Sequence, residues 1–265
     1  MALRSANDPL RTSQIEQSQK MPEQNSLSWK RIFAEGAAIV ASILLAFAID
    51  AWWVDRNEIE RESRILMSLL AEIDQNQELL RQAGDEYKRR YMDALKILEY
   101  IDVSPTDIDN AQLRPLIRSV LTIRTFHLES GTLAGLLAAG ELSLIRNEGL
   151  RGRLAAWPSQ IVEWSEEQEA VFVYVRDIMV PFLSNKVQLR HIGPDFAPFP
   201  DGESLPNVPT GEADNDSIAE LITSVEFDNL MFRRAQGLWY AIRDGETLTA
   251  QLSEIDGQIR EYISE

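Results

Sequence analysis

Residues 29–55 read WKRIFAEGAAIVASILLAFAIDAWWVD and form the most apolar stretch of the chain. The uncharged core, 36–49, has 14 residues, and the wider segment 32–54 has 23, with its two charges, Glu35 and Asp50, near the ends. A helix of that wider length is about 34 Å long, enough to cross the hydrocarbon region of a bilayer. A charge near the end of a span is far less costly than one at its centre. The segment therefore predicts a single transmembrane helix.

Aromatic and basic residues mark both edges of this segment. Trp29 precedes it, and Trp52 and Trp53 close it, so three of the six tryptophans lie where an aromatic belt meets the membrane interface. Lys30 and Arg31 lie at the N-terminal edge, whereas the C-terminal edge opens on acidic residues. Because basic flanks stay on the cytoplasmic side, we predict a cytoplasmic N-terminus. These five residues are the predicted membrane-interface site.

Two other interpretations of the segment compete with a retained span. In a signal peptide, Ala46-Phe47-Ala48 would serve as the small-x-small cleavage site, although a long polar leader and Glu35 argue against it. In a soluble protein the segment would be a buried helix, which does not explain the tryptophans at both edges. The spacing of small residues also permits two spans to pair as a homodimer, through Ala34, Ala37, Ala38, Ala41 and Ser42.

The charge of the chain divides at the same segment. The 265 residues include 26 Lys+Arg and 42 Asp+Glu, a net charge of −16, yet residues 1–31 carry five basic and three acidic side chains. Residues 1–28 are rich in Ser, Gln, Asn and Pro, and they have too few large apolar side chains to offset the entropy of ordering. We therefore predict a disordered cytoplasmic tail (1–28), a transmembrane helix (29–54) and an extracytoplasmic helical bundle (55–265).

Residues 55–103 contain no proline, and their apolar residues keep helical spacing. The pattern predicts one long helix that continues the span and ends before Pro105. Asn76 falls on the apolar stripe, either as a buried polar residue that sets the register or as an exposed residue at a loose point. The predicted stripe comprises Ile59, Leu66, Leu69, Ile73, Leu80, Ala83, Tyr87, Tyr91, Ala94, Leu98 and Ile101.

The middle of the chain predicts three further helices. Residues 107–127 have a helical pattern in which Pro115 suggests a start near that proline. A short helix should follow and end at Gly140. Asn147 is the predicted N-cap of a helix that Pro158 should kink and that should end soon after Pro181.

The last helix is signalled twice, because Ser217 precedes Glu220 and Thr223 precedes Glu226 at capping-box spacing. A heptad-like apolar stripe then runs from 231 to 262. Before it, the proline-rich loop 185–216 carries Phe196 and Phe199, which either bind a partner or dock on the bundle. No strand alternation is present, so the fold class is all-α: a single transmembrane helix continuing into an elongated antiparallel helical bundle.

Three patterns together resemble an uncharacterised bacterial family of single-span membrane proteins with a helical extracytoplasmic domain. They are E-x-x-x-I-V-x-x-I-L-L-A-F-x-I-D-A-W-W at 35–53, L-x-x-L-x-x-E-x-x-x-N at 66–76, and a Leu- and Gly-rich patch at 130–151. The resemblance covers about residues 30–260, with 50–53 more acidic and aromatic than the family pattern. It implies a location in the bacterial inner membrane and supplies no activity and no catalytic residue.

The composition excludes several classes of function and of chemical site. The absence of cysteine rules out a disulfide, a thiolate zinc site and a thiol nucleophile, and the acidic charge argues against nucleic acid. His127, beside Glu129 at a predicted helix end, and His191 are poor candidates for a catalytic base, and no cofactor or metal site is predicted. We therefore expect a non-enzymatic membrane-anchored scaffold that binds the bilayer and a protein partner. The alternative is an extracytoplasmic ligand-sensing bundle that signals through a separate partner.

Overall fold

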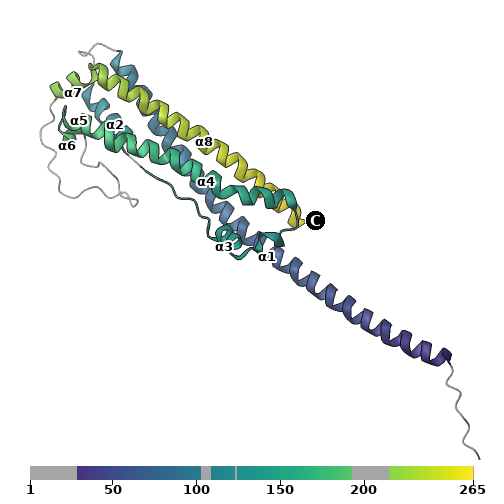
Figure 1. Ribbon diagram of the computed structural model, residues 1–265. Coiled ribbons are helices and arrows are strands. Elements are labelled where there is room, and N and C mark those ends of the chain that lie inside the picture. The colour runs from purple at the N-terminus through teal and green to yellow at the C-terminus, as the bar shows by residue number, and fades with distance from the viewer. Residues whose placement is uncertain (1–28, 103–108, 123, 193–214, 265) are drawn as a thin grey trace, which may run out of the picture. The chain divides into compact units, whose positions relative to one another are not determined.

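The computed structural model is shown in Figure 1 and describes residues 29–102, 109–122, 124–192 and 215–264. The described residues are mainly helical and include no strand, which confirms the all-α prediction. The chain divides into two units, Met1–Asp55 and Arg56–Glu265. The predicted tail, residues 1–28, and the predicted partner loop with Phe196 and Phe199 lie outside the described residues.

The longest helix, α1 (Trp29–Ile101), has 73 residues and includes the whole predicted span. The prediction that the helix of the second unit continues the apolar segment is therefore confirmed. Every side chain from Trp29 to Arg61 is exposed, and Ile59, predicted to begin the buried stripe, is 41% exposed. The buried residues of α1 are Glu62, Leu66, Leu69, Glu72, Ile73, Asn76, Leu80, Ala83, Tyr87, Arg90, Ala94 and Ile97.

Two hydrophobic clusters hold the second unit together. The first joins side chains of α1, α4 (Glu148–Tyr174) and α8 (Val225–Ser264). The second joins the last turns of α1 and the first turns of α8 to α2 (Asn110–Leu121) and to the short helices between α4 and α8. Figure 1 shows α4 and α8 side by side. Burial of apolar surface is the main stabilising contribution here, and the predicted stripes cover one another.

Helix α2 begins and ends at different residues from those predicted. It begins at Asn110, because the Asp109 side chain accepts a hydrogen bond from Ala111 N at 2.9 Å and caps the first turn. Pro115 therefore lies inside the helix and does not start it. The helix ends at Leu121, where Thr122 turns into extended backbone, so the predicted continuation to 127 is wrong.

The next two helix ends confirm their predicted signals. Helix α3 (Gly131–Ala139) stops at Gly140, whose φ of 68° lies in the left-handed region that only glycine adopts without strain. A short 3₁₀ turn, η2 (Glu141–Leu144), follows. The Asn147 side chain then accepts from Leu150 N at 3.0 Å and caps α4.

After α4 the backbone widens into a π-helical turn, η3 (Val175–Met179), before α5 (Val180–Ser184) and α6 (Leu189–Ile192). Pro181 lies in the first turn of α5, directly after the π-helical turn, and it has no N–H to donate to a carbonyl of that turn. The helix ends three residues later, as predicted.

The predicted last helix is in fact two helices, and the first capping-box signal does not mark a helix start, because Ser217 is the third residue of a helix that begins at Asn215. Helix α7 (Asn215–Ile222) precedes α8, which begins at Val225. The N-cap of α8 is Ser224, whose Oγ accepts from Phe227 N at 3.3 Å. The predicted cap, Thr223, instead donates its hydroxyl to carbonyls of α7. The prediction was one residue out because adjacent Ser and Thr both have capping side chains.

Candidate functional site

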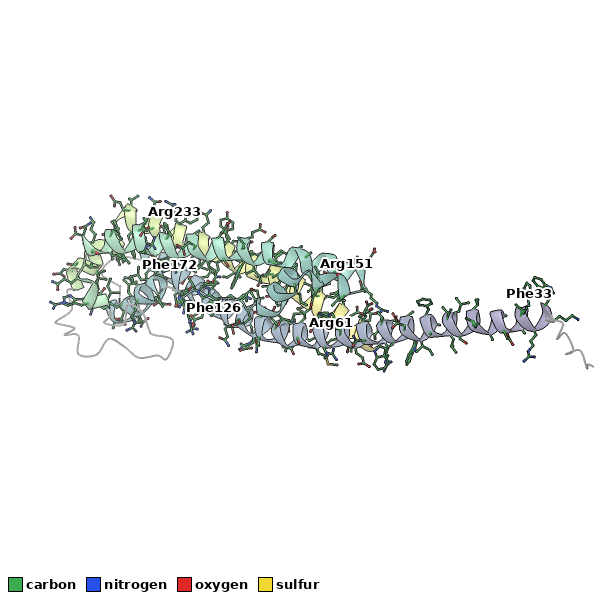
Figure 2. All side chains as sticks on the ribbon, turned by 60° about the horizontal axis from the view of Figure 1, so that its bottom comes forward. Phe33, Arg61, Phe126, Arg151, Phe172 and Arg233 are labelled. Carbon is green, nitrogen blue, oxygen red and sulfur yellow. The ribbon has the colours of Figure 1, made fainter. Side chains whose placement is uncertain are left out.

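The predicted membrane-interface residues all lie exposed on α1. Trp29, Trp52 and Trp53 are 78%, 62% and 66% exposed, and the rings of Trp52 and Trp53 are 6.5 Å apart. Lys30 is exposed beside Arg31, which pairs with Glu35 at 3.3 Å. In Figure 2 the side chains of this part of α1, Phe33 among them, project outward from the helix. Of the described residues, α1 is the one helix long and apolar enough to cross a membrane.

The predicted span-packing residues are exposed as well. They lie between Ala34 and Ser42 along α1, and Ala38 and Ala41 share this stretch. The Ser42 hydroxyl donates to Ala38 O at 2.7 Å, so its polar group is satisfied within its own helix. The stretch is therefore compatible with a lipid environment, and pairing through it stays a prediction.

Two buried amides clamp an extended segment, residues 124–130, which we call the strap. Asn76 Nδ2 donates to Glu129 O at 2.7 Å, and Glu129 N donates to Asn76 Oδ1 at 2.7 Å. Gln168 Nε2 donates to Phe126 O at 3.1 Å, and Phe126 N donates to Gln168 Oε1 at 2.8 Å. Each amide satisfies the N–H and the C=O of one strap residue, as a neighbouring strand would. Asn76 is thus a buried polar residue that sets the register of the strap on α1.

Two buried carboxylates of α1 hold the segment that follows the strap. Glu72 Oε2 accepts from Thr132 N at 2.6 Å in the first turn of α3, whose N-cap residue Ser130 makes no side-chain capping bond. Glu62 Oε1 accepts from Arg146 N at 2.7 Å. A carboxylate stabilises the positive N-terminal end of a helix, so Glu72 caps α3 from another element. The patterns at 66–76 and 130–151 are therefore joined by the hydrogen bond between Thr132 N and Glu72.

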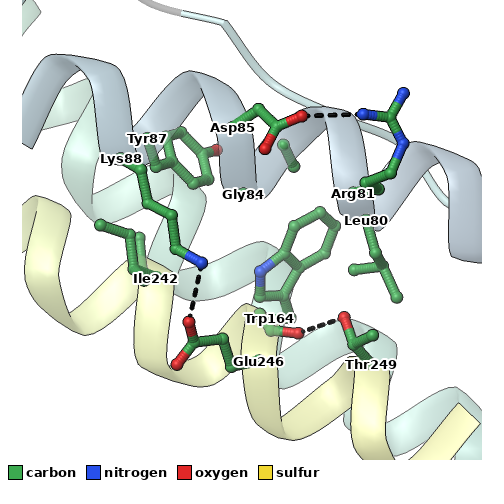
Figure 3. Close-up of a pocket in the computed structure, with 13 residues that line it drawn as sticks. Leu80, Arg81, Gly84, Asp85, Tyr87, Lys88, Trp164, Ile242, Glu246 and Thr249 are labelled. Carbon is green, nitrogen blue, oxygen red and sulfur yellow. Dashed lines mark hydrogen bonds and ion pairs between the residues drawn. The ribbon is translucent and has the colours of Figure 1, made fainter.

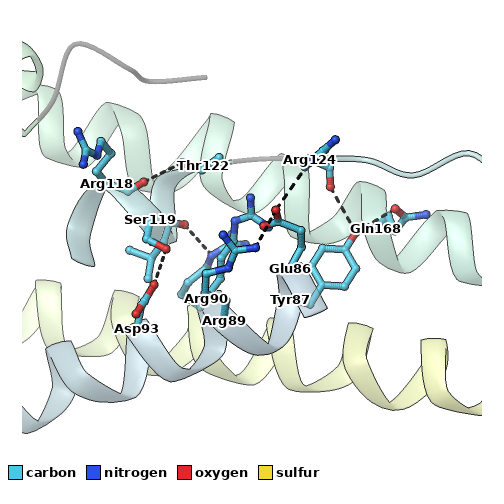
Figure 4. A network of polar contacts seen from close by, with 12 residues as sticks. Glu86, Tyr87, Arg89, Arg90, Asp93, Arg118, Ser119, Thr122, Arg124 and Gln168 are labelled. Carbon is cyan, nitrogen blue, oxygen red and sulfur yellow. Dashed lines mark hydrogen bonds and ion pairs between the residues drawn. The ribbon is translucent and has the colours of Figure 1, made fainter. Parts of the chain in front are cut away.

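The second polar group surrounds Glu86 on α1 (Figure 4). Its carboxylate lies 3.0 Å from Arg89, 2.9 Å from Arg90 and 3.6 Å from Arg124. Three guanidinium groups on one carboxylate leave a net positive charge inside an otherwise acidic unit. Burial lowers the pKa of Arg90 from its ordinary value, and the nearby Glu86 charge opposes that shift.

Tyr87 joins this group to the strap clamp. Its hydroxyl donates to Gln168 Oε1 at 2.9 Å, and its ring packs edge-on against Phe126 with centroids 6.1 Å apart. Burial raises the pKa of Tyr87 above its ordinary value, although the positive charge of Arg90 opposes the shift. The hydroxyl therefore stays neutral at physiological pH and acts as a hydrogen-bond donor.

Among the described residues, Arg234 of α8 is the largest side chain that is fully buried, with 2% exposed. Its Nε donates to Val120 O at 2.9 Å, at the end of α2, and its Nη1 donates to Val171 O at 3.4 Å, one turn before the π-helical turn η3. Burial lowers its pKa to about 9, and the positive Arg90 adds to the shift, so the group remains charged near neutrality. The cation thus donates to a carbonyl at the end of α2 and to a carbonyl of α4 that also accepts from Val175 N.

These buried polar side chains bond mainly to backbone groups of neighbouring segments, and among the described residues they do not form a recognisable catalytic arrangement. His127 is exposed in the strap, six residues beyond the end of α2 and not at a helix end as predicted. Among the described residues no three His, Cys, Asp or Glu side chains are arranged to hold a metal ion. The sequence interpretation missed Gln168 and Arg234. Both interrupt an apolar stripe at a position that helical spacing assigns to the core, and that interruption was the available signal.

No protein-family model, no curated protein and no solved structure matches the chain. The resemblance to bacterial single-span proteins therefore stays a prediction.

Replacing Asn76 with Asp tests the strap clamp. The new carboxylate cannot donate to Glu129 O, so the free energy of unfolding should fall by about 1–3 kcal/mol at pH 7. Only the protonated carboxyl donates, so its pKa is higher in the folded than in the unfolded state. The lost stability should return as the pH falls through that raised pKa. Urea unfolding of the full chain at pH 7 and pH 5, followed by circular dichroism, measures both effects.

The matched control is N57D, because Asn57 is exposed on the same helix. A loss of stability equal to that of this control, or a loss that does not depend on pH, would contradict the clamp.

Proposed function

We propose that the protein is a membrane-anchored helical interaction protein with one transmembrane span. The observation that carries the proposal is the exposure of every side chain from Ile32 to Val54. Isolated apolar residues on a surface are ordinary. A continuous apolar segment exposed on all sides of a helix, however, must be shielded from water by lipid or by another protein. The segment is about 34 Å long as a helix, enough to cross the hydrocarbon core of a bilayer of about 30 Å, and tryptophans lie at both of its edges.

Contacts within the second unit support an antiparallel helical bundle. Asp74, Lys88 and Tyr91 of α1 contact Arg260, Glu246 and Trp239 of α8, so positions rise along one helix as they fall along the other. The pairs Arg153–Glu254 and Tyr174–Leu230 show the same order for α4 and α8. This order is that of an up-down arrangement of neighbouring helices.

An exposed aromatic patch supports the interaction role. Phe232 and Trp239 lie seven residues apart on one face of α8 and are 60% and 44% exposed. The Trp239 ring lies 5.7 Å from the Tyr91 ring, and the Arg243 guanidinium lies 5.8 Å from the centre of the Trp239 ring. Aromatic residues, Met and Arg are the types enriched at protein interfaces. We propose this patch as the surface for a protein partner.

A photo-crosslinking residue at Phe232 tests the patch in native membranes. We expect irradiation to give one discrete crosslinked protein band. The matched control is Val162 on α4, which is 56% exposed and lies outside the patch. Equal crosslinking from both positions, or none from either, would contradict the proposal.

The orientation is tested with a reporter that is active only outside the cytoplasm. Fused after Glu265 it should be active, and fused before Trp29 it should be inactive, because Lys30 and Arg31 keep the N-terminal edge inside. Replacing both basic residues with Glu should lower the fraction correctly inserted. Reversed reporter activities would rule out this topology.

A ligand-sensing bundle is the second candidate function. The observation that favours it is a cavity beside Trp164 between α1, α4 and α8.

A further inference from the structure

A cavity of about 240 Å³ lies within the second unit where α1, α4 and α8 meet (Figure 3). Two of its lining residues are glycines in helix interiors, Gly84 of α1 and Gly245 of α8. A Cβ added at Gly84 would meet nothing within 4 Å, and one added at Gly245 would lie 3.5 Å from Trp164 Nε1. Glycine in a helix interior is less favourable than alanine. The two glycines therefore lower the stability of their helices while leaving the space of the cavity unfilled.

The cavity contains one unsatisfied polar group. Trp164 is 3% exposed, and its Nε1 has no hydrogen-bond partner. In Figure 3 the indole nitrogen points toward the side of the cavity where Lys88 and Glu246 meet. A buried N–H without an acceptor destabilises the folded state, and a ligand with an acceptor atom would remove that loss.

The remaining walls define the charge and polarity of the ligand. Leu80, Ala83 and Ile242 supply apolar surface. The charges at the rim are already paired: Lys88 Nζ lies 2.9 Å from Glu246, and Arg81 lies 2.8 Å from Asp85. An ionised ligand would lose its hydration without meeting an unpaired charge, so the walls favour a neutral molecule.

The rim also allows access. Lys88 and Glu246 are both 55% exposed, and an exposed ion pair of this kind contributes little to stability. Parting them opens the side of the cavity toward which the indole nitrogen points. A dry apolar cavity of about 150 Å³ holds benzene, so the larger volume here suits one ring with a short substituent.

We propose that this cavity binds a small neutral monocyclic molecule that carries one carbonyl or hydroxyl oxygen, which accepts a hydrogen bond from Trp164 Nε1. The proposal rests on the second unit alone and is independent of membrane insertion.

The test uses the full chain in lipid nanodiscs and follows the six tryptophan indole N–H signals by ¹H–¹⁵N NMR, with W164F assigning the relevant one. Acetophenone is the probe, α-methylstyrene is its isostere without an acceptor, and benzoate is a charged analogue. We expect acetophenone to shift the Trp164 signal downfield in a saturable way. The isostere should bind roughly tenfold more weakly, and benzoate should cause no shift.

Variants separate the cavity from partitioning into lipid. G84L fills the cavity and should abolish the saturable shift. G84A should raise the melting temperature, because alanine favours the helix, while weakening acetophenone binding. W164F keeps an aromatic ring, although a smaller one, and removes the donor, so in ligand-observed NMR it should bind acetophenone and the isostere equally. If G84L does not fold, G84A and W164F carry the test.

Three results would overturn the proposal: no saturable shift with acetophenone, an equal response to all three probes, or an unchanged affinity in both G84A and W164F. Each would mean that the space is filled by water or that the probe binds elsewhere.

Discussion

Removal of residues 32–54 is expected to transfer the protein from the membrane fraction to the soluble fraction. Within the described part of the chain this is the only segment apolar enough to insert, and the second unit has its own hydrophobic clusters. The full-length chain should remain in the membrane fraction after both alkaline carbonate and high-salt extraction. The shortened chain should be in the soluble fraction without either treatment. Fractionation followed by immunoblotting measures the distribution.

Point substitutions in the centre of the span give the matched control. Replacing Leu44 and Leu45 with Arg adds about 2.5–3.5 kcal/mol of insertion cost for each residue and should release the protein, whereas replacing both with Ala should not. Sequencing of the mature N-terminus tests the signal-peptide alternative. A chain that begins at Ile49, or a full-length protein extracted by salt alone, would show that the span is not retained.

Replacing Gln168 with Leu should destabilise the second unit by about 2–5 kcal/mol. The substitution keeps the approximate volume but leaves Phe126 N, Phe126 O and the Tyr87 hydroxyl without their present partner. Each buried polar group left unsatisfied costs about 1–3 kcal/mol, with partial relief where the structure relaxes. Urea denaturation of the full-length chain, followed by circular dichroism, measures the change in the free energy of unfolding.

The control is Q82L on α1, because Gln82 is exposed and bonds only within its own helix, to Glu78. This substitution should change stability by no more than about 0.5 kcal/mol. The strap clamp is wrong if Q168L and Q82L have the same effect. The structural interpretation gains support if tryptic cleavage at Arg124 accelerates in Q168L alone, because the strap is then no longer held.

Local sequence was enough to determine the all-α class, the course of α1 and several helix ends. Helical spacing of apolar residues depends only on the period of the backbone, so the stripes on α1, α4 and α8 were readable in advance. The stops at Gly140 and the cap at Asn147 follow from the conformational and hydrogen-bonding properties of single residues. The apolar segment likewise predicts its own insertion, because transfer to lipid depends on composition and length.

Local signals failed where two of them competed. Pro115 suggested a helix start, but Asp109 caps α2 six residues earlier, and the helix continues through Pro115 to Leu121. At the start of α8, two neighbouring hydroxyl residues have similar capping ability, and only the path of the chain selects Ser224.

Only the tertiary structure decided what the buried polar residues do. Glu72, Asn76 and Gln168 bond to backbone groups 42 to 60 residues away in the chain. Arg234 bonds to a carbonyl 114 residues away. Helical spacing assigns Asn76, Gln168 and Arg234 to core positions, but it does not show which donor or acceptor each will meet, and Glu72 lies beside the predicted stripe. The cavity beside Trp164 also depends on the tertiary structure, because its volume is set by how side chains of three helices pack against one another. Periodicity is a property of one helix, whereas satisfaction of a buried polar group and the volume of a cavity belong to several helices at once.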